Sequence, residues 1–150
     1  MKIYLATDHA GFELKEKIKA FLLESNYQVE DFGAFSYDAE DDYPDFIHKA
    51  AMAVSNNPEE DRGIVLGGSG QGEAMIANRY KKVRAAVFYG GSEDIIKLSR
   101  EHNNANVLSL GARFIKEEDA LGAVKLWLAT SFSKEERHQR RINKIDFPAA

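Results

Sequence analysis

The segment Gly63-Ile64-Val65-Leu66-Gly67-Gly68-Ser69-Gly70-Gln71-Gly72-Glu73 indicates the fold class of this chain more directly than any other. Its short apolar run is typical of a buried strand, and the glycines that follow are typical of a tight loop leading into a helix. Such a loop exposes a row of backbone N–H groups that can bind an anion. The segment therefore predicts one strand–loop–helix unit of an α/β fold, with a carboxylate beside an anion cradle.

The loop fits neither of the two common nucleotide-binding motifs. A P-loop continues with Lys and then Ser or Thr, but Glu73-Ala74 stands at that place. The dinucleotide fingerprint needs Gly or Ala where Glu73 stands. What remains is a set of N–H dipoles beside one carboxylate, which suits removal of a proton from carbon and stabilisation of the resulting oxyanion. The alternative is a plain strand-to-helix turn in which the helix dipole favours an acidic residue.

Outward from this segment, short runs rich in Ile, Val, Leu and aromatic residues predict five strands, at 3–7, 28–32, 63–66, 84–89 and 106–110. Helical spacing of apolar residues predicts helices at 12–24, from about Pro44, and at about 72–80, 92–100 and 116–129. A last helix is expected at about 133–145, with Ser133 and Glu136 as a capping box. Strands that alternate with helices predict a single domain over residues 1–150, with a parallel sheet between two helix layers.

The composition narrows the class of protein. With 150 residues, 44% hydrophobic and 29% charged, the chain suits one globular domain. No run approaches the roughly 18 apolar residues of a membrane span, and no signal peptide is recognised, so we expect a cytoplasmic protein without a membrane partner. The absence of cysteine excludes disulfides, cysteine nucleophiles and thiolate metal sites. A net charge of -4 argues against nucleic-acid binding.

Candidate site residues follow from the expected sheet, because ligands bind beyond the carboxyl ends of parallel strands. The segments at those ends are Asp8-His9, the glycine loop with Glu73, and Gly111-Ala112-Arg113. Asp8 is equally well explained as a helix cap, and His9 as a surface turn residue. The long acidic loop 33–43 fits no calcium-binding pattern, so we expect it to be solvated or lid-like.

Further candidates come from the second half of the chain. His102 stands before the fifth expected strand, as either a helix-terminal cation or an acid–base group. Arg137 and Arg141 are four residues apart and so share one helix face, which forms either a phosphate clamp or a solvated basic surface. His48 is expected on the surface without a notable polar neighbour. The histidines show no metal-ligand spacing, so we expect no metal.

Taken together, several motifs closely resemble those of the type B ribose-5-phosphate isomerases, in the same order and spacing. They are Asp8-His9-Ala10-Gly11, Asp42-Tyr43-Pro44, the Gly67–Glu73 loop with Ala77-Asn78, Arg100-Glu101-His102-Asn103-Asn104-Ala105, Gly111-Ala112-Arg113 and Arg137-His138-Gln139-Arg140-Arg141. The resemblance spans about residues 2 to 146. It implies a Rossmann-like, three-layer α/β/α fold whose five parallel strands lie in the order 2-1-3-5-4.

The resemblance also assigns roles. One branch of the family begins the glycine loop with a cysteine base, whereas the branch that includes the mycobacterial enzymes ends it with a glutamate; Gly67 and Glu73 match the second branch. Glu73 is then the carbon base, and His102 assists opening of the furanose ring with Asp8 nearby. The remaining implied substrate or phosphate contacts are His9, Tyr43, Gly68, Ser69, Gly70, Gln71, Gly72, Asn103, Arg113, Arg137, His138 and Arg141.

The resemblance implies interconversion of ribose 5-phosphate and ribulose 5-phosphate through a cis-enediolate, in the pentose phosphate pathway and without a cofactor. It further implies an active site completed across a homodimer interface. Two alternatives stay open at this point. One is an isomerase of galactose, allose or tetrose phosphates. The other is a phosphate-ligand binding protein without turnover, which would need the cradle and clamp but neither Glu73 nor His102.

Overall fold

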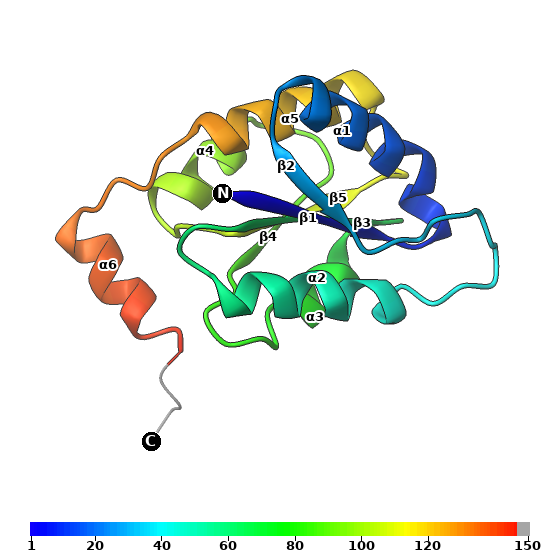
Figure 1. Ribbon diagram of the computed structural model, residues 1–150. Helices are drawn as coiled ribbons and strands as arrows, with labels where there is room; N and C mark the ends of the chain where they lie inside the picture. The colour runs from blue at the N-terminus through cyan, green and yellow to red at the C-terminus, as the bar shows by residue number, and fades with distance from the viewer. Residues whose placement is uncertain (147–150) are drawn as a thin grey trace.

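A five-stranded parallel sheet lies between two layers of helices in the computed structural model, which describes residues 1–146 (Figure 1). The strands are β1 (Lys2–Thr7), β2 (Gln28–Asp31), β3 (Arg62–Gly67), β4 (Ala85–Phe88) and β5 (Val107–Gly111). Every neighbouring pair runs parallel, in the order β2-β1-β3-β5-β4. The expected three-layer α/β/α architecture and its strand order are confirmed.

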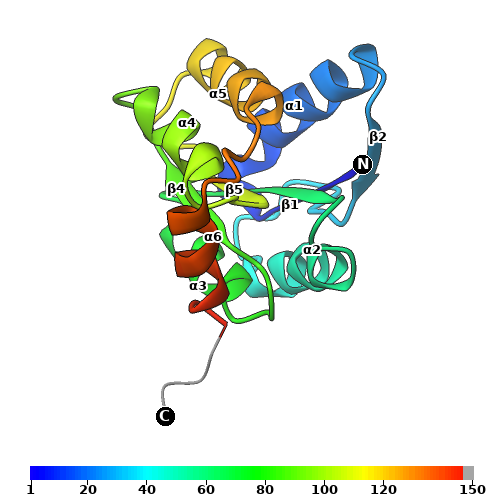
Figure 2. The ribbon, with the colours of Figure 1, turned by 90° about the vertical axis from the view of Figure 1, so that its left-hand side faces the viewer.

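Each face of the sheet is covered by its own helices. Figures 1 and 2 show α1 (Phe12–Glu24), α4 (Asp94–Glu101) and α5 (Glu117–Ala129) on one face, and α2 (Pro44–Asn56) and α3 (Gln71–Ala77) on the other. A short 3-10 helix, η1 (His9–Gly11), leads into α1, and α6 (Glu136–Asn143) lies to one side of the layers, at the left in Figure 1. Within residues 1–146, no helix has both the length and the apolar character needed to cross a membrane.

β1, β3 and β5 are buried on both faces, because helices cover each side of the sheet and successive side chains of a strand point to opposite sides. On β1, Ile3 and Leu5 join the cluster beneath α1, α4 and α5, whereas Tyr4 and Ala6 join the cluster beneath α2 and α3. β3 and β5 alternate in the same way. Burial on both faces explains why these strands read as continuous apolar runs in the sequence.

The capping box expected at the start of the last helix is wrong. α6 begins at Glu136, and its N-cap is Glu135 rather than Ser133. Lys134 has a φ of 59°, a left-handed conformation that interrupts a helix before it could start at Ser133. The Ser133 hydroxyl instead accepts a hydrogen bond from the Glu135 N–H, and the Ser133 N–H donates to the carbonyl of Glu101. The last turn of α4 thus fixes where the chain enters α6.

The parallel sheet has two chemically different edges. The segments that follow strands, namely η1, the glycine loop and the turn at Gly111–Arg113, gather at the carboxyl edge. The turn between α4 and β5 lies at the amino edge, where the Asn106 carbonyl accepts from the N–H of Gly63 at the start of β3. Figure 1 shows loop 33–43 and α6 at opposite ends of the sheet. Site residues carried by these segments are therefore separated by the length of the strands.

Candidate active site

A cavity of about 520 Å³ opens at the carboxyl edge of the sheet. This volume is typical of a small-molecule site. Its lining consists of Asp8, His9, Ala10, Tyr43, Gly68, Ser69, Gly72, Glu73, Arg113 and Phe114. Most of the residues expected at the strand ends thus meet in one place. Gly70 and Gln71 belong to the same loop but not to the lining, and Ala10 and Phe114 were not anticipated as site residues.

The glycine loop forms an open row of backbone donors. The N–H groups of Gly68, Ser69, Gly70 and Gly72 have no hydrogen-bond partner within residues 1–146, whereas that of Gln71 donates to Ser69 Oγ. Gly70, at the N-cap of α3, has a φ of 78°, and a Cβ there would lie 3.0–3.2 Å from backbone atoms of β5. Glycine is therefore required for the loop to pack on β5. The free donors at a helix N-terminus suit an anion.

Glu73 is a buried carboxylate at the edge of this cradle, only 4% exposed. Burial raises the pKa of Glu73, and the neighbouring Asp8 carboxylate adds to the rise. A Cβ at Gly67 would overlap the Glu73 carboxyl group, so the side chain occupies space that any other residue at 67 would fill. The residue at position 67 must therefore be small if Glu73 is to keep this position. Glu73 itself has the burial and the neighbouring N–H donors that suit a base acting at carbon.

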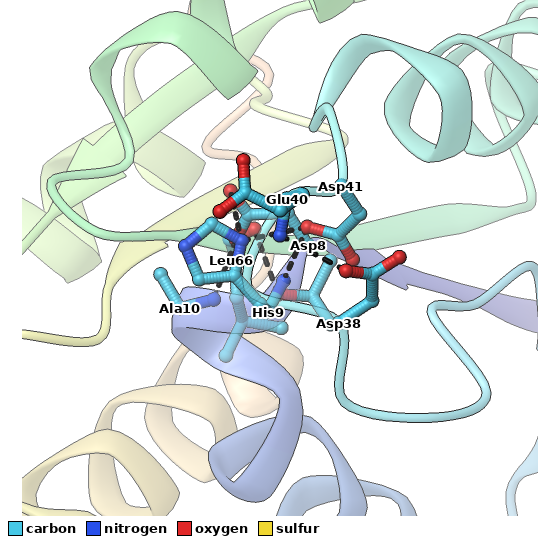
Figure 3. Close-up of polar contacts among 8 residues, drawn as sticks. Asp8, His9, Ala10, Asp38, Glu40, Asp41 and Leu66 are labelled. Carbon is cyan, nitrogen blue, oxygen red and sulfur yellow. Dashed lines mark hydrogen bonds and ion pairs between the residues drawn. The ribbon is translucent and has the colours of Figure 1, made fainter.

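Asp8 and His9 hold defined positions above the end of β1. Asp8 caps η1 by accepting the Ala10 N–H, so its capping role is confirmed, and the same side chain lines the cavity. His9 Nδ1 lies 2.6 Å from Asp41 Oδ1, and the same oxygen accepts the backbone N–H of His9 at 3.0 Å (Figure 3). The hydrogen bond to Asp41 raises the pKa of His9. Loop 33–43 is therefore fastened to the site through Asp41, a residue that the sequence did not single out.

The Asp8, His9 and Asp41 side chains bring oxygen and nitrogen atoms within 4.8 Å of one another. Sequence spacing gave no sign of this group, because its members come together through tertiary packing. The Nδ1 of His9 is engaged with Asp41, and Asp8 is engaged with the Ala10 N–H. We interpret the group as a hydrogen-bonded network that orients His9, and the expected absence of a metal stays a prediction.

The other predicted site residues form a second cluster at the amino edge. The His102 and His138 rings stack with centroids 4.1 Å apart. His138 is buried, and burial together with His102 lowers its pKa. Its Nε2 has no hydrogen-bond partner within the described residues. Asn103, Arg137 and Arg141 are exposed beside this pair, with Arg137 Nε bonded to Glu135.

Two buried arginines hold the turn that carries His102 and Asn103. Arg100 donates to the Thr130 and Ala105 carbonyls and to Asn104 Oδ1. Arg84 Nε donates to the Asn103 and Asn104 carbonyls. Burial lowers the pKa of both arginines, that of Arg100 to about 10. The turn is therefore built around guanidinium groups that satisfy its carbonyls, which sequence reasoning did not detect.

One chain does not bring the two clusters together. Glu73 and Asp8 lie beyond the carboxyl ends of the strands, and His102 lies before the amino end of β5, whose five residues span about 17 Å. Asp8 and His102, which the resemblance places near each other, are thus on opposite edges within a single chain. His48 is exposed as expected, but its Nδ1 lies 2.8 Å from the hydroxyl of Tyr80, so the expectation that it lacks a polar neighbour is wrong.

Comparison with known proteins gives consistent matches over nearly the whole chain. Residues 3–145 match the family described as Ribose/Galactose Isomerase. Ribose-5-phosphate isomerase B of Mycolicibacterium paratuberculosis is 48% identical over 143 residues, which cover 95% of this chain and 88% of that protein. The protein of the same name from Mycobacterium tuberculosis is 43% identical over 143 residues, with coverages of 95% and 86%.

Solved structures agree with these matches. Ribose-5-phosphate isomerase B from Mycoplasma genitalium with bound ribulose-5-phosphate has a TM-score of 0.92 and 41% identity, covering 97% of this chain and 93% of that one. The Thermotoga maritima ribose 5-phosphate isomerase has a TM-score of 0.88 and 46% identity, covering 97% of each chain. The motifs, the strand order and these matches coincide, and the chain belongs to the ribose/galactose isomerase family, among the type B ribose-5-phosphate isomerases.

Proposed function

We propose that this protein is an aldose-ketose isomerase that interconverts ribose 5-phosphate and ribulose 5-phosphate. The observation that carries the proposal is Glu73, a buried carboxylate with a raised pKa beside a row of free backbone N–H groups. A phosphate-binding protein without turnover has no need of this carboxylate. The relative from Mycoplasma genitalium, solved with bound ribulose-5-phosphate, supports this choice of sugar.

The proposed mechanism assigns one step to each group. His102 donates a proton to the ring oxygen of the cyclic sugar phosphate, the bond from that oxygen to C1 breaks, and the C1 hydroxyl loses its proton to water to give the open-chain aldehyde. Glu73 then removes the C2 proton of the open-chain aldehyde, and the loop N–H groups stabilise the negative oxygen of the cis-enediolate. A proton passes from O2 to O1, and Glu73 returns its proton to C1, which gives the ketose. Arginine side chains bind the phosphate, and this remote binding orients the reacting end of the sugar.

A homodimer is part of the proposal, because the two clusters stand at opposite edges of one sheet. In a dimer the amino-edge cluster of one copy, with His102, Asn103 and Arg137, would complete the carboxyl-edge cavity of the other. The free donors of the glycine loop and the unpaired Arg113 at the cavity are consistent with an incomplete site in the single chain. Within residues 1–146, Arg113 forms no ion pair. The cytoplasmic location expected from the sequence also stays a prediction, which cell fractionation tests.

The test is a coupled assay of the purified protein against pentose, hexose and tetrose phosphates. We expect the highest kcat/KM with ribose 5-phosphate. A higher value with another sugar phosphate would favour a different member of the family, and phosphate binding without any turnover would favour a binding protein.

Metal dependence is tested in the same assay, because no step above uses a metal. Activity should survive exhaustive treatment with a chelator followed by its removal. Loss of activity that a divalent ion restores would contradict the proposed mechanism.

A further inference from the structure

We propose that Asp41 is the positioning residue of His9: its carboxylate accepts the Nδ1–H, so that Nε2 carries the second proton and faces the substrate phosphate. The inference rests on the proposed function in so far as His9 binds the phosphate. The pairing between Asp41 and His9 can itself be tested without substrate.

Asp41 contacts His9 through one of its two carboxylate oxygens, and the other, Oδ2, is buried without a hydrogen-bond partner within residues 1–146. One carboxylate oxygen accepts both the Nδ1–H and the backbone N–H of His9, and the Asp41 side chain is only 10% exposed. The loop that carries it is tied to the end of β1 at its start, where Thr7 donates to the Gly33 carbonyl and accepts from the Ala34 N–H. The loop that carries Asp41 therefore starts next to the end of β1, two residues before His9 in the sequence.

The imidazole stands between Asp41 and the cavity. His9 lines the cavity and Asp41 does not, and the Asp41 carboxylate contacts the ring at Nδ1. The two nitrogens of an imidazole lie on different sides of the ring, and a partner on Nδ1 leaves Nε2 for the ligand. In Figure 3 one ring nitrogen of His9 faces the Asp41 carboxylate, and the other lies on the opposite side of the ring from Asp41.

The charges around His9 favour its cationic form. Asp41 makes the largest contribution to a raised pKa of His9, and Asp8, with an oxygen 3.9 Å from Nδ1, adds to it. Arg113 and partial burial act in the opposite direction. Tyr37 packs edge-on against the ring with centroids 6.1 Å apart and adds no formal charge. Because the pKa is raised, the cation persists to a higher pH than in an ordinary histidine and is lost as the pH rises through that value.

The cavity contains carboxylates as well as the residues proposed to bind a phosphate dianion. Asp8 and Glu73 line the same space as the proposed phosphate contacts and would repel a dianion. A third carboxylate facing the ligand would add to the repulsion, but Asp41 does not line the cavity and acts through the imidazole. By favouring the protonated form of His9, Asp41 keeps a positive charge on the imidazole, which is the group that the ligand meets.

The central variant is Asp41→Asn, because an amide oxygen can still accept the Nδ1–H while the negative charge is removed. Asp41→Ala removes both the acceptor and the charge. Asp38→Asn is the matched control: Asp38 is an exposed acid of the same loop, and its contact is to the Glu40 N–H rather than to His9. His9→Gln assigns the resonance of the His9 ring.

The first measurement is an NMR titration of the histidine rings in the full-length protein without ligand. The pKa of His9 should fall in Asp41→Asn and in Asp41→Ala, and should stay at the wild-type value in Asp38→Asn. In the wild type the neutral ring, observed above the pKa, should carry its proton on Nδ1. An unchanged His9 pKa in Asp41→Asn would overturn the proposal.

The second measurement is the affinity for inorganic sulfate as a function of pH, because sulfate stays a dianion throughout and its binding then reports protein groups alone. At a pH below the His9 pKa values of both proteins, as measured in the NMR titration, wild type and Asp41→Asn should bind sulfate equally, since both carry cationic His9. At a pH between the two measured His9 pKa values the variant should bind roughly tenfold more weakly, the loss expected for one charge-assisted contact. Equal affinity at both pH values would also overturn the proposal.

Kinetics separate this inference from the proposed function. If ribose 5-phosphate is the substrate, Asp41→Asn should raise its KM at neutral pH while kcat changes little, and Asp38→Asn should match the wild type. A wild-type protein that does not isomerise any sugar phosphate would refute the proposed function while the NMR titration still decides the role of Asp41. A variant that loses kcat with an unchanged KM would refute the positioning role while the function stands.

Discussion

Glu73 combines two properties that are hard to place in one side chain. It is buried, which raises its pKa and makes it a stronger base, and it follows a row of backbone donors that can hold the oxyanion it creates. Burial of a carboxylate is unfavourable for the free energy of folding when the group is ionised. We infer that the protein retains Glu73, despite this loss of folding free energy, because the buried carboxylate acts as the base.

The first prediction concerns that carboxylate. Glu73→Gln keeps the shape of the side chain but removes the base, so kcat should fall by at least about a hundredfold. Sulfate affinity should not fall, since the cradle is intact and a carboxylate that repels the dianion is removed. A kcat within a few-fold of the wild type would reassign the base.

The pH dependence of the wild type gives the second prediction. Glu73 acts as a base only when ionised, so kcat should rise with pH through its pKa and be lost below it. Because that pKa is raised from 4.5, the acidic limb of the profile should lie at higher pH than for an ordinary glutamate. The limb should be absent from the residual activity of Glu73→Gln; its persistence there would assign it to another group.

Gly67 provides the third prediction. A methyl group at this position would overlap the Glu73 carboxyl group, so Gly67→Ala should displace the base and lower kcat nearly as much as Glu73→Gln. Urea unfolding should show a loss of stability of about 1–3 kcal/mol from overpacking. In a Glu73→Ala background the same change should cost much less, because the overlapping atoms are gone. An equal loss in both backgrounds would show that the overlap is relieved elsewhere.

At the scale of elements, the turn between α4 and β5 is built around Arg100. Its guanidinium group reaches α5 through the Thr130 carbonyl and the turn through the Ala105 carbonyl, so one side chain joins three parts of the chain. A lysine has a single donor group and cannot match this fork. The position of His102 therefore depends on Arg100, which need not contact the substrate.

Arg100→Lys should accordingly lower the free energy of unfolding by about 1–3 kcal/mol for each buried acceptor left without a donor. It should also reduce turnover, because the turn that carries His102 loses its support. Arg137→Lys is a suitable control, since Arg137 is exposed and its recorded partner is the exposed Glu135. Urea denaturation of both variants measures the difference; equal stability would show that Arg100 does not hold the turn.

At the scale of the whole molecule, the separation of Glu73 from the α6 arginines by the sheet leads to a complementation experiment. The homodimer of Glu73→Gln and the homodimer of Arg137→Ala should each have low activity. Their heterodimers should regain about half the wild-type activity per dimer, because one of two sites then has both residues intact. No recovery, with heterodimers confirmed by native mass spectrometry, would place both residues in one chain and contradict a site shared between copies.

The fold was largely predictable, because its signals are local. Ile3 and Leu5 alternate with Tyr4 and Ala6 along β1, and such apolar runs between amphipathic helices specify a parallel sheet covered on both faces. The limits of α6 were predicted less well, since the left-handed Lys134 and the bond from Ser133 to Glu101 depend on how α4 lies beside the chain. Helix ends respond to such tertiary contacts more than helix interiors do.

The sequence by itself determined the order of elements, the residues at the strand ends and the pairing of a glycine cradle with Glu73, because periodicity and neighbouring residues encode them. Only the tertiary structure decided that Asp41 meets His9 across 32 residues, that Glu73 occupies the space beside Gly67, and that His102 lies at the edge of the sheet opposite to Glu73. These facts depend on how separate segments pack against one another, and the side-chain positions that result are set by the whole core rather than by any stretch of chain.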